Sequence, residues 1–218
     1  MMTVGELATT RPLSVKVLQR LGIDFCCGGG RALDEACAAR SVDADALLAE
    51  VAGLESGARP DERRWDQAPL VDLVDHILVK HHRPLDTELP RLGALLRKVT
   101  GVHYDKDPDR MDGLRLAWSD LQEDLVPHMA KEESVLFPWI QAGQGASAGS
   151  PIQVMEAEHE RVGEILVALR RLTDDYVVPE EACGSWRALW QGLEALEADL
   201  HRHIHLENNV LFPRALRG

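Results

Sequence analysis

Two copies of one short motif hold most of the residues in this chain that could do chemistry. The motif is H-x-x-x-E-x-x-V-L-F-P, and it begins at His128 and again at His203. In a helix, residues four apart lie on one face, about 6 Å apart along the axis. Each copy therefore directs one imidazole and one carboxylate, from Glu132 or Glu207, to the same side. Two such pairs facing each other would form the protein half of a two-metal site.

Apolar residues continue each motif along one helical face. The stripes run Leu114, Trp118, Leu121, Leu125, His128, Glu132, Val135 in the first copy and Trp186, Leu189, Leu193, Leu196, Leu200, His203, Glu207, Val210 in the second. Steps of three and four residues are typical of the buried seam of a packed helix. A carboxylate in such a seam is destabilising unless a charge or hydrogen bonds compensate it. Two hydrogen-bonded Glu–His pairs, or a solvated face, are the alternatives, but the repetition of the pair favours bound metal.

The same periodicity predicts four long helices, over Leu70–Val99, Pro108–Ile140, Pro151–Leu172 and Pro179–Leu216. The first and third each place one histidine in the seam, at His82 and His159, whereas the second and fourth each place a His–Glu pair. His82 and His159 lie 77 residues apart, and the two motif histidines lie 75 apart. This internal repeat predicts an all-α fold, an up-and-down four-helix bundle with pseudo-twofold symmetry and the site between its halves.

Two prolines lie beside candidate ligands. Pro84 follows His82 by two residues, and Pro127 directly precedes His128. Proline removes a backbone hydrogen bond from a helix, so we expect a kink or bulge near each that re-aims the imidazole. A helix boundary at the proline is the alternative.

The overall composition excludes several classes of partner. The 218 residues carry a net charge of −12, which argues against nucleic acid and anionic membrane as partners. No apolar run approaches the ~18 residues of a membrane span. The N-terminus lacks the basic start and apolar core of a signal peptide. We therefore expect a cytoplasmic protein.

Residues 1–58 predict a small domain of short helices, followed by a linker at 59–66 and the bundle at 67–218. The segment Asp24-Phe25-Cys26-Cys27-Gly28-Gly29-Gly30 interrupts the short helices, and its three glycines mark a turn where the backbone closely approaches another group. A bridge between adjacent Cys26 and Cys27 would be strained, so the four cysteines suit a reducing compartment rather than a disulfide framework. Cys37 and Cys183 are expected to be structural.

The predicted seams contain six candidate ligands, which is more than a single tetrahedral ion can coordinate. These are His82, His128, Glu132, His159, His203 and Glu207. Two ions bridged by the glutamates would use all six and neutralise the buried carboxylates. Imidazole and carboxylate without thiolate suit iron, manganese or zinc, and histidine-rich ligation with an open position suits chemistry on dioxygen or nitric oxide. Iron therefore fits best, although zinc or manganese could occupy the same cage.

These stretches resemble a known family. The four-helix part is similar to hemerythrin-like di-iron proteins, and the full chain more closely resembles the repair-of-iron-centres family, also called the YtfE/ScdA family. The resemblance rests on residues 24–29, 75–82, 103–106, 128–138, 156–159 and 203–215. It implies the six ligands above and a seventh family histidine at His103, which spacing alone would place on the surface between the first two long helices.

The resemblance also implies a function. It implies a stress protein that restores iron–sulfur clusters damaged by nitric oxide or oxidants, and we expect two oxo- or carboxylate-bridged irons that supply damaged or apo iron–sulfur proteins. There are two alternatives. One is reduction of nitric oxide to nitrous oxide, and the other is reversible binding of dioxygen or nitric oxide as a sensor or store. Whether the protein is an enzyme depends on which of these functions it has. Cys26 and Cys27 would provide a thiol that contacts the metal site, receives an electron or nitrosyl, or docks a partner. Simple packing in a small core is their alternative role.

Overall fold

The computed structural model describes residues 2–57 and 64–218. Within these ranges the backbone forms helices and no strand, with one isolated bridge between Thr3 and Ala32, so the expected all-α class is confirmed. The chain divides into two compact units. The first contains the described residues up to 77 together with 139–152 and 201–218, and the second contains residues 78–138 and 153–200.

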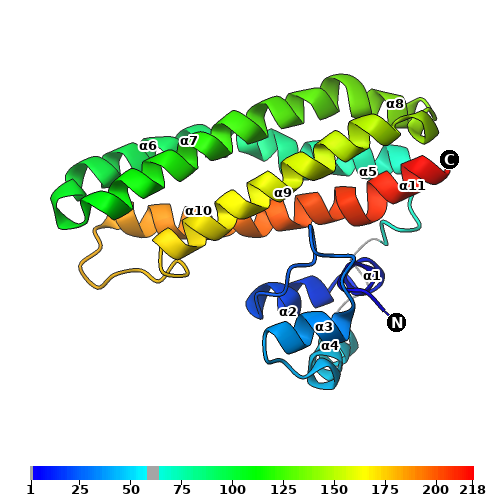
Figure 1. Ribbon diagram of the computed structural model, residues 1–218, viewed down its shortest axis with the longest axis horizontal. Coiled ribbons are helices and arrows are strands. Elements are labelled where there is room, and N and C mark those ends of the chain that lie inside the picture. The colour runs from blue at the N-terminus through cyan, green and yellow to red at the C-terminus, as the bar shows by residue number, and fades with distance from the viewer. Residues whose placement is uncertain (1, 58–63) are drawn as a thin grey trace. The chain divides into compact units, whose positions relative to one another are not determined.

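Four long helices make up the second unit. They are α6 (Arg83–Val102), α7 (Pro108–Lys131), α9 (Gly149–Leu172, from residue 153) and α10 (Gly184–His205, up to residue 200), and they lie side by side (Figure 1). Each helix contacts the next in a closed ring: Thr100 with Arg115, Gly113 with Leu172, Arg170 with Glu197, and Gly192 with Leu92. This is the expected four-helix bundle.

An ion pair between a partly exposed arginine and a buried carboxylate joins α9 to α10. Nε and Nη2 of Arg170 donate to the carboxylate of Glu197 at 3.0 and 2.9 Å, and Glu197 is only 4% exposed. Arg170→Met keeps the aliphatic stem but removes the cation from beside this carboxylate. We expect the free energy of unfolding, measured in urea, to fall by about 1 to 3 kcal/mol. Arg171→Met, at the exposed neighbouring position, is the control, and equal losses in the two variants would contradict a stabilising pair.

Three of the four expected long helices contain a π-helical turn. These turns are η1 (Leu78–His82), η3 (Glu132–Leu136) and η5 (Leu206–Leu211), and they continue α5 (Leu70–Ile77) into α6, α7 into α8 (Phe137–Gln141) and α10 into α11 (Phe212–Arg217). Each turn holds one candidate ligand, which agrees with the frequent occurrence of π turns at functional sites. The bulge expected near Pro84 is confirmed, whereas Pro127 lies inside α7 and the bulge follows it.

The π turn changes which side chains are buried after Glu132. The N–H of Phe137 donates to the carbonyl of Glu132, five residues back, so the turn contains one additional residue. Val135, expected in the seam, is therefore 42% exposed, and Leu136 is buried instead. Pro138 follows directly and has no N–H to lose in the widened turn.

The N-terminal part of the first unit contains four short helices, α1 (Val4–Thr10), α2 (Ser14–Arg20), α3 (Leu33–Ala39) and α4 (Ala44–Gly57). Thr3 caps α1, because its hydroxyl accepts from the N–H of Glu6 while the Glu6 carboxylate accepts from the N–H of Thr3. One buried cluster forms the core of these helices: Val4, Leu7, Ala8, Val17, Leu18, Ile23, Phe25, Leu33, Ala36, Cys37, Leu47 and Val51. Of the expected linker, residues 59–63 lie outside the described ranges.

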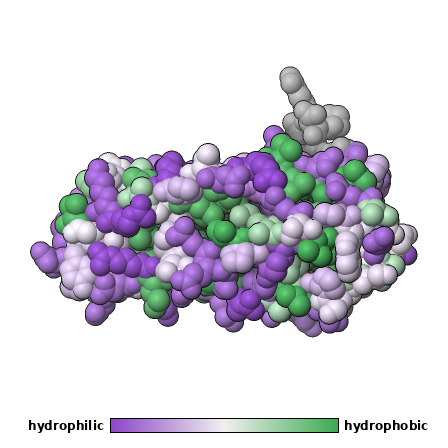
Figure 2. Space-filling view, turned by 90° about the horizontal axis from the view of Figure 1, so that it is seen from above, coloured by the Kyte–Doolittle hydropathy of each residue, from purple (hydrophilic) through white to green (hydrophobic). Residues whose placement is uncertain are grey.

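One face of the molecule illustrates the hydropathy of its surface. Figure 2 shows a face on which hydrophilic residues predominate, with hydrophobic residues between them. In the part of the chain that the structure describes, no helix is long and apolar enough to cross a bilayer.

Candidate metal centre

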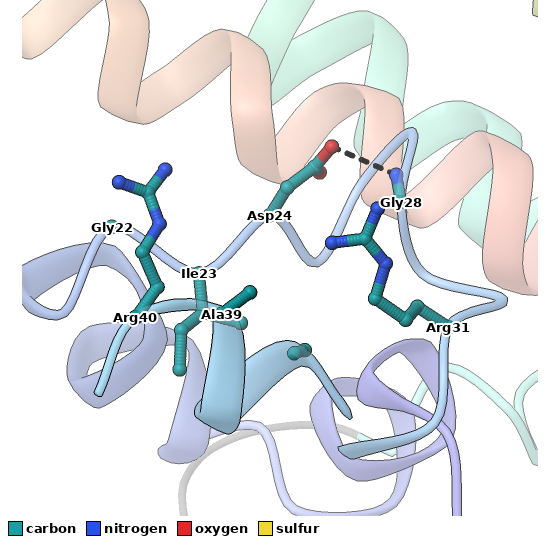
Figure 3. A pocket seen from close by; sticks show the side chains of 8 residues that line it. Gly22, Ile23, Asp24, Gly28, Arg31, Ala39 and Arg40 are labelled. Atoms are coloured by element: carbon teal, nitrogen blue, oxygen red, sulfur yellow. Dashed lines mark hydrogen bonds between the residues drawn. The ribbon is translucent and has the colours of Figure 1, made fainter. Parts of the chain in front are cut away.

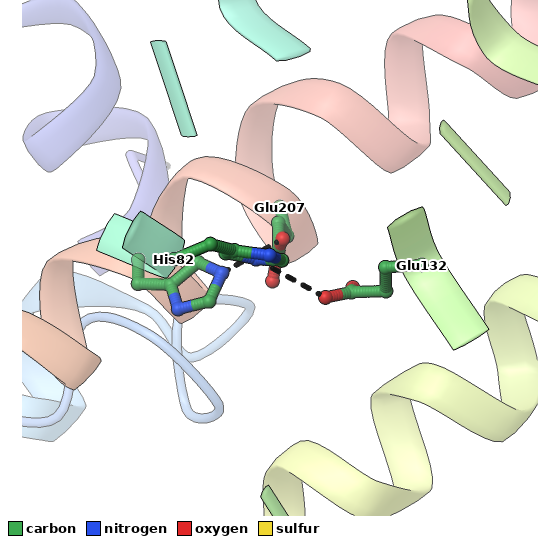
Figure 4. Close-up of side chains that lie close together, drawn as sticks. His82, Glu132 and Glu207 are labelled. Carbon is green, nitrogen blue, oxygen red and sulfur yellow. Dashed lines mark hydrogen bonds and ion pairs between the residues drawn. The ribbon is translucent and has the colours of Figure 1, made fainter. Parts of the chain in front are cut away.

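Four of the six expected ligands lie together in the second unit: His82, His128, Glu132 and His159. All four are buried, with no more than 2% exposed. Nε2 of His82 lies 3.5 Å from Oε2 of Glu132 (Figure 4). Nε2 of His128 lies 3.4 Å from the same oxygen. Nε2 of His159 lies 3.0 Å from Nε2 of His128. Three imidazoles and one carboxylate therefore converge in a buried region.

Two further carboxylates hold the opposite edges of these rings. Oε1 of Glu133 lies 2.9 Å from Nδ1 of His82, and Oε2 of Glu158 lies 2.9 Å from Nδ1 of His128. A carboxylate accepts, so each Nδ1 donates and each Nε2 presents its lone pair toward Glu132. Carboxylates orient metal-binding histidines in this way and raise the basicity of the ring.

Basic side chains keep these outer carboxylates ionised. Burial raises the pKa of Glu158, but hydrogen bonds from Lys131 and His128 outweigh burial and leave that pKa below its usual value. Arg83 and His82 lower the pKa of Glu133 against burial in the same way. The periodicity did not identify either glutamate, because each lies off the seam. The available signal was an acidic residue directly beside a candidate ligand.

Glu158→Gln tests this outer layer. The amide keeps the size of the side chain but removes the charge that orients His128. We expect metal affinity, measured by competition with a chromophoric chelator, to fall by about 10- to 100-fold. Glu160→Gln, at an exposed position two residues further along α9, should bind metal as wild type does. An equal loss in both variants would contradict a specific role for Glu158.

The second copy of the motif lies in the first unit. Nε2 of His203 is 3.0 Å from Oε1 of Glu207, and the two side chains are 1% and 0% exposed. Figure 4 shows Glu207 on the helix that carries it. The imidazole and the carboxylate therefore lie on one buried face, as the spacing predicts, and reproduce the donor types of the first copy.

Glu132 shows that these residues fit a cation. Its side chain is fully buried, and within the described ranges neither carboxylate oxygen has a hydrogen-bond partner. Burying an ionised carboxylate costs several kcal/mol unless a positive charge or hydrogen bonds compensate it. A metal cation would satisfy both this carboxylate and the imidazole lone pairs. Donors of these two kinds, without thiolate, fit iron, manganese or zinc.

His82 and His103 lie at opposite ends of α6. His103 follows α6 and comes 21 positions after His82 in the sequence. At about 1.5 Å per helical residue this is roughly 30 Å. Its side chain is only 9% exposed, so it does not lie on the surface either. The expectation that it joins the same ligand set is therefore corrected: the backbone length of α6 keeps His103 from the ions that His82 could bind.

The loop with the paired cysteines lies against η5 within the first unit. Nδ2 of Asn209 donates to the carbonyls of Phe25 and Cys26 at 3.3 and 3.0 Å, and Nδ1 of His205 donates to the carbonyl of Phe25 at 3.2 Å. Burial lowers the pKa of His205 to about 4, so this ring is neutral at pH 7. A Cβ at Gly29 would collide with Oδ1 of Asn209, which explains why this position of the turn is a glycine. The expected close approach is therefore confirmed at Gly28 and Gly29, whereas a Cβ added at Gly30 would meet no atom of the described residues within 4 Å.

The two thiols of this loop have different surroundings. Sγ of Cys26 is buried and donates to Oδ1 of Asp24 at 3.2 Å, and Oδ2 of Asp24 accepts the N–H of Gly28 at 2.9 Å (Figure 3). The thiol of Cys27, 3.9 Å away, raises the pKa of Cys26 well above its ordinary value, together with burial and Asp24. Cys26 is therefore protonated at neutral pH, and the half-buried Cys27 is the more accessible sulfur.

Comparisons with known proteins agree with this arrangement. A family model for the hemerythrin HHE cation binding domain matches residues 73–215, and a second, ScdA_N, a domain of unknown function, matches residues 1–55. The chain is 44% identical to the iron–sulfur cluster repair protein YtfE of Cronobacter sakazakii and 43% identical to that of Escherichia coli O1:K1 / APEC. Both alignments extend over 215 residues, 99% of this chain and 96% of the relative. This chain therefore belongs to the YtfE family, and its larger part is a hemerythrin HHE cation binding domain.

Proposed function

We propose that this protein repairs damaged iron–sulfur clusters by supplying iron from a two-ion centre. Identity of 43–44% to YtfE repair proteins over nearly the whole chain supports the repair role. The buried carboxylate of Glu132, with two imidazole Nε2 atoms beside it, is the observation that supports a metal centre. The proposed clients are damaged or apo iron–sulfur proteins.

The proposed ligand sets share both carboxylates. They are His82, Glu132, His203 and Glu207 for one ion, and His128, Glu132, His159 and Glu207 for the other. Each ion would then have two imidazoles of its own, and the two carboxylates would compensate part of the charge of both ions. Iron is the proposed metal, with zinc and manganese as alternatives, because a histidine-rich set with an open position suits iron.

The residues of the chain would determine how firmly the iron is held. Bound iron would supply Lewis-acid and redox chemistry. Glu133 and Glu158 orient two of the imidazoles, and a set with only two shared carboxylates should release iron more readily than a carboxylate-rich cage. The loop with Cys26 and Cys27 is the proposed docking or electron-accepting element. We also propose a small helical domain over residues 1–58, a linker over 59–66 and the bundle over 67–218. The proposed location is the cytoplasm, where cysteines remain reduced.

Iron transfer to an apo iron–sulfur protein tests this function. Protein purified without oxygen is loaded with ferrous iron, and its iron is counted by metal analysis and Mössbauer spectroscopy. It is then mixed with the apo client, sulfide and a reductant. We expect two irons per chain and recovery of client activity with wild type, but no recovery with Glu132→Leu. Equal recovery with both would refute the proposal.

Two other results of the same preparation would change the assignment. Nitrous oxide released after a single addition of nitric oxide would indicate a nitric oxide reductase. An oxygen adduct that survives repeated binding cycles would indicate a reversible carrier. Recovery of the client without either result would favour iron supply.

A further inference from the structure

A cysteine and a histidine lie side by side in the second unit, away from the expected ligands. Cys183 immediately precedes α10, and its Sγ lies 3.5 Å from Nε2 of His103. The cysteine is exposed rather than structural, which corrects the sequence expectation, and the histidine is nine-tenths buried. An accessible sulfur is thus paired with a fixed imidazole, the arrangement that activates cysteine nucleophiles.

Packing holds the imidazole in this direction. The ring centroid of His103 lies 4.6 Å from that of Trp186, which itself lies 5.6 Å from Trp190. The backbone N–H of His103 donates to the carbonyl of Val99 at 3.0 Å, which ties the residue to the end of α6. These contacts limit rotation of the ring, so Nε2 stays directed at the sulfur.

Backbone donors and one lysine favour negative charge on the sulfur. The backbone N–H of Trp186, in the first turn of α10, hydrogen-bonds Cys183 and is the main cause of its lowered pKa. Burial opposes this effect, while the N–H of Ser185 and the charge of Lys98 each lower the pKa by a smaller amount. A helix N-terminus stabilises negative charge in the same way. The ammonium group of Lys106 lies 6.0 Å from the centroid of the Trp186 ring, on the same side of the unit. The pKa of the thiol is therefore lowered, and a second lysine, Lys106, lies near the tryptophan that packs against His103.

The other cysteines contrast with this environment. The interaction with Cys27 and burial raise the pKa of Cys26, and burial raises that of Cys37. Thiolate is the reactive form of cysteine, so buried thiols of raised pKa react slowly. Compared with Cys26 and Cys37, Cys183 combines exposure, an imidazole partner and a lowered pKa.

We propose that Cys183 is a modification site that forms mixed disulfides with small anionic disulfides, assisted by His103. In this step Sγ of Cys183 attacks one sulfur of the disulfide, and a new S–S bond forms while the old one breaks. The proton released by Cys183 passes through Nε2 of His103 to the departing thiolate, which leaves as a thiol. One small disulfide is consumed for each modified chain, and it is the only oxidant required. Lys98 and Lys106 favour disulfides that carry carboxylates.

Reaction with dithiobis-nitrobenzoate, an anionic disulfide, tests this proposal. Reduced full-length protein is mixed with a limiting amount of this reagent at several pH values. The released nitrothiobenzoate, which ionises in solution, is followed by its absorbance, and the labelled peptide is identified by mass spectrometry. We expect Cys183 to be labelled first, and more quickly than with the cationic disulfide cystamine. Cys183→Ser should remove the fast phase. First labelling at Cys27 would overturn the proposal.

Two variants separate the contribution of the imidazole from that of the charge. His103→Gln should slow the labelling of Cys183 by about tenfold near neutral pH and move its rate–pH profile to higher pH, because less of the sulfur is thiolate. Lys98→Gln, an exposed substitution that leaves the packing intact, should reduce the preference for the anionic reagent. Circular dichroism checks that each variant is folded. A rate unchanged in both folded variants would contradict the proposal.

Discussion

Glu132→Leu is expected to abolish the binding of both metal ions and to make the metal-free protein more stable than metal-free wild type. Binding of both ions is lost because this carboxylate belongs to both proposed ligand sets. The gain in stability follows from its burial, since leucine fills a similar volume without a charge. Replacing buried charged groups by apolar side chains commonly stabilises a protein by about 1 to 4 kcal/mol.

Metal should reverse this order of stabilities. A ligand that binds only the folded state stabilises it by about 4 kcal/mol at a free concentration a thousandfold above its Kd. Zinc or anaerobic ferrous iron should therefore raise the melting temperature of wild type and leave that of Glu132→Leu unchanged. Calorimetry with and without metal, together with metal analysis of the same samples, measures both effects.

The control for this prediction carries the same substitution on the surface. Glu160→Leu replaces an exposed carboxylate on α9 and should bind metal and melt as wild type does. If metal-free Glu132→Leu were less stable than metal-free wild type, and metal did not stabilise wild type, the protein itself would satisfy this carboxylate. That result would favour the alternative of structural Glu–His pairs.

The second large effect is expected in the N-terminal loop. Alanine at both Cys26 and Cys27 should abolish cluster repair while the protein still binds two irons. Neither thiol belongs to the proposed ligand sets, so the iron content should be preserved, whereas a redox or docking role would be lost with the sulfurs. Client recovery and iron content are measured on the same preparation.

Cys37→Ala provides the matched control. Cys37 is a buried cysteine of the same N-terminal core, so its loss tests whether a small packing defect alone stops repair. We expect this variant to repair normally at a temperature where it is folded. Cys27→Ser should lose more activity than Cys26→Ser, because Cys27 is the more accessible sulfur. Full repair by the double alanine variant would show that the two cysteines only pack.

The long helices and their buried histidines were predictable because helical periodicity is a local property. Steps of three and four residues placed His82 and His159 in the seams of separate helices, and both are buried. The prediction was wrong at Val135, where one additional residue in the π turn exchanges it with Leu136. A regular helical period does not predict this extra residue, because the order of apolar residues does not reveal the hydrogen-bond pattern of the widened turn.

Sequence alone therefore determined the class of fold, the family and the chemical types of the candidate ligands, because each depends on residue identity and spacing within single helices. Only the tertiary structure decided which other residues hold the candidate ligands in position. Glu133 and Glu158 reach the outer edges of two imidazoles from positions off the seam. The length of α6 separates His103 from His82 and brings it to Cys183 instead. Such pairings arise from the packing of segments distant in sequence, which local spacing does not encode.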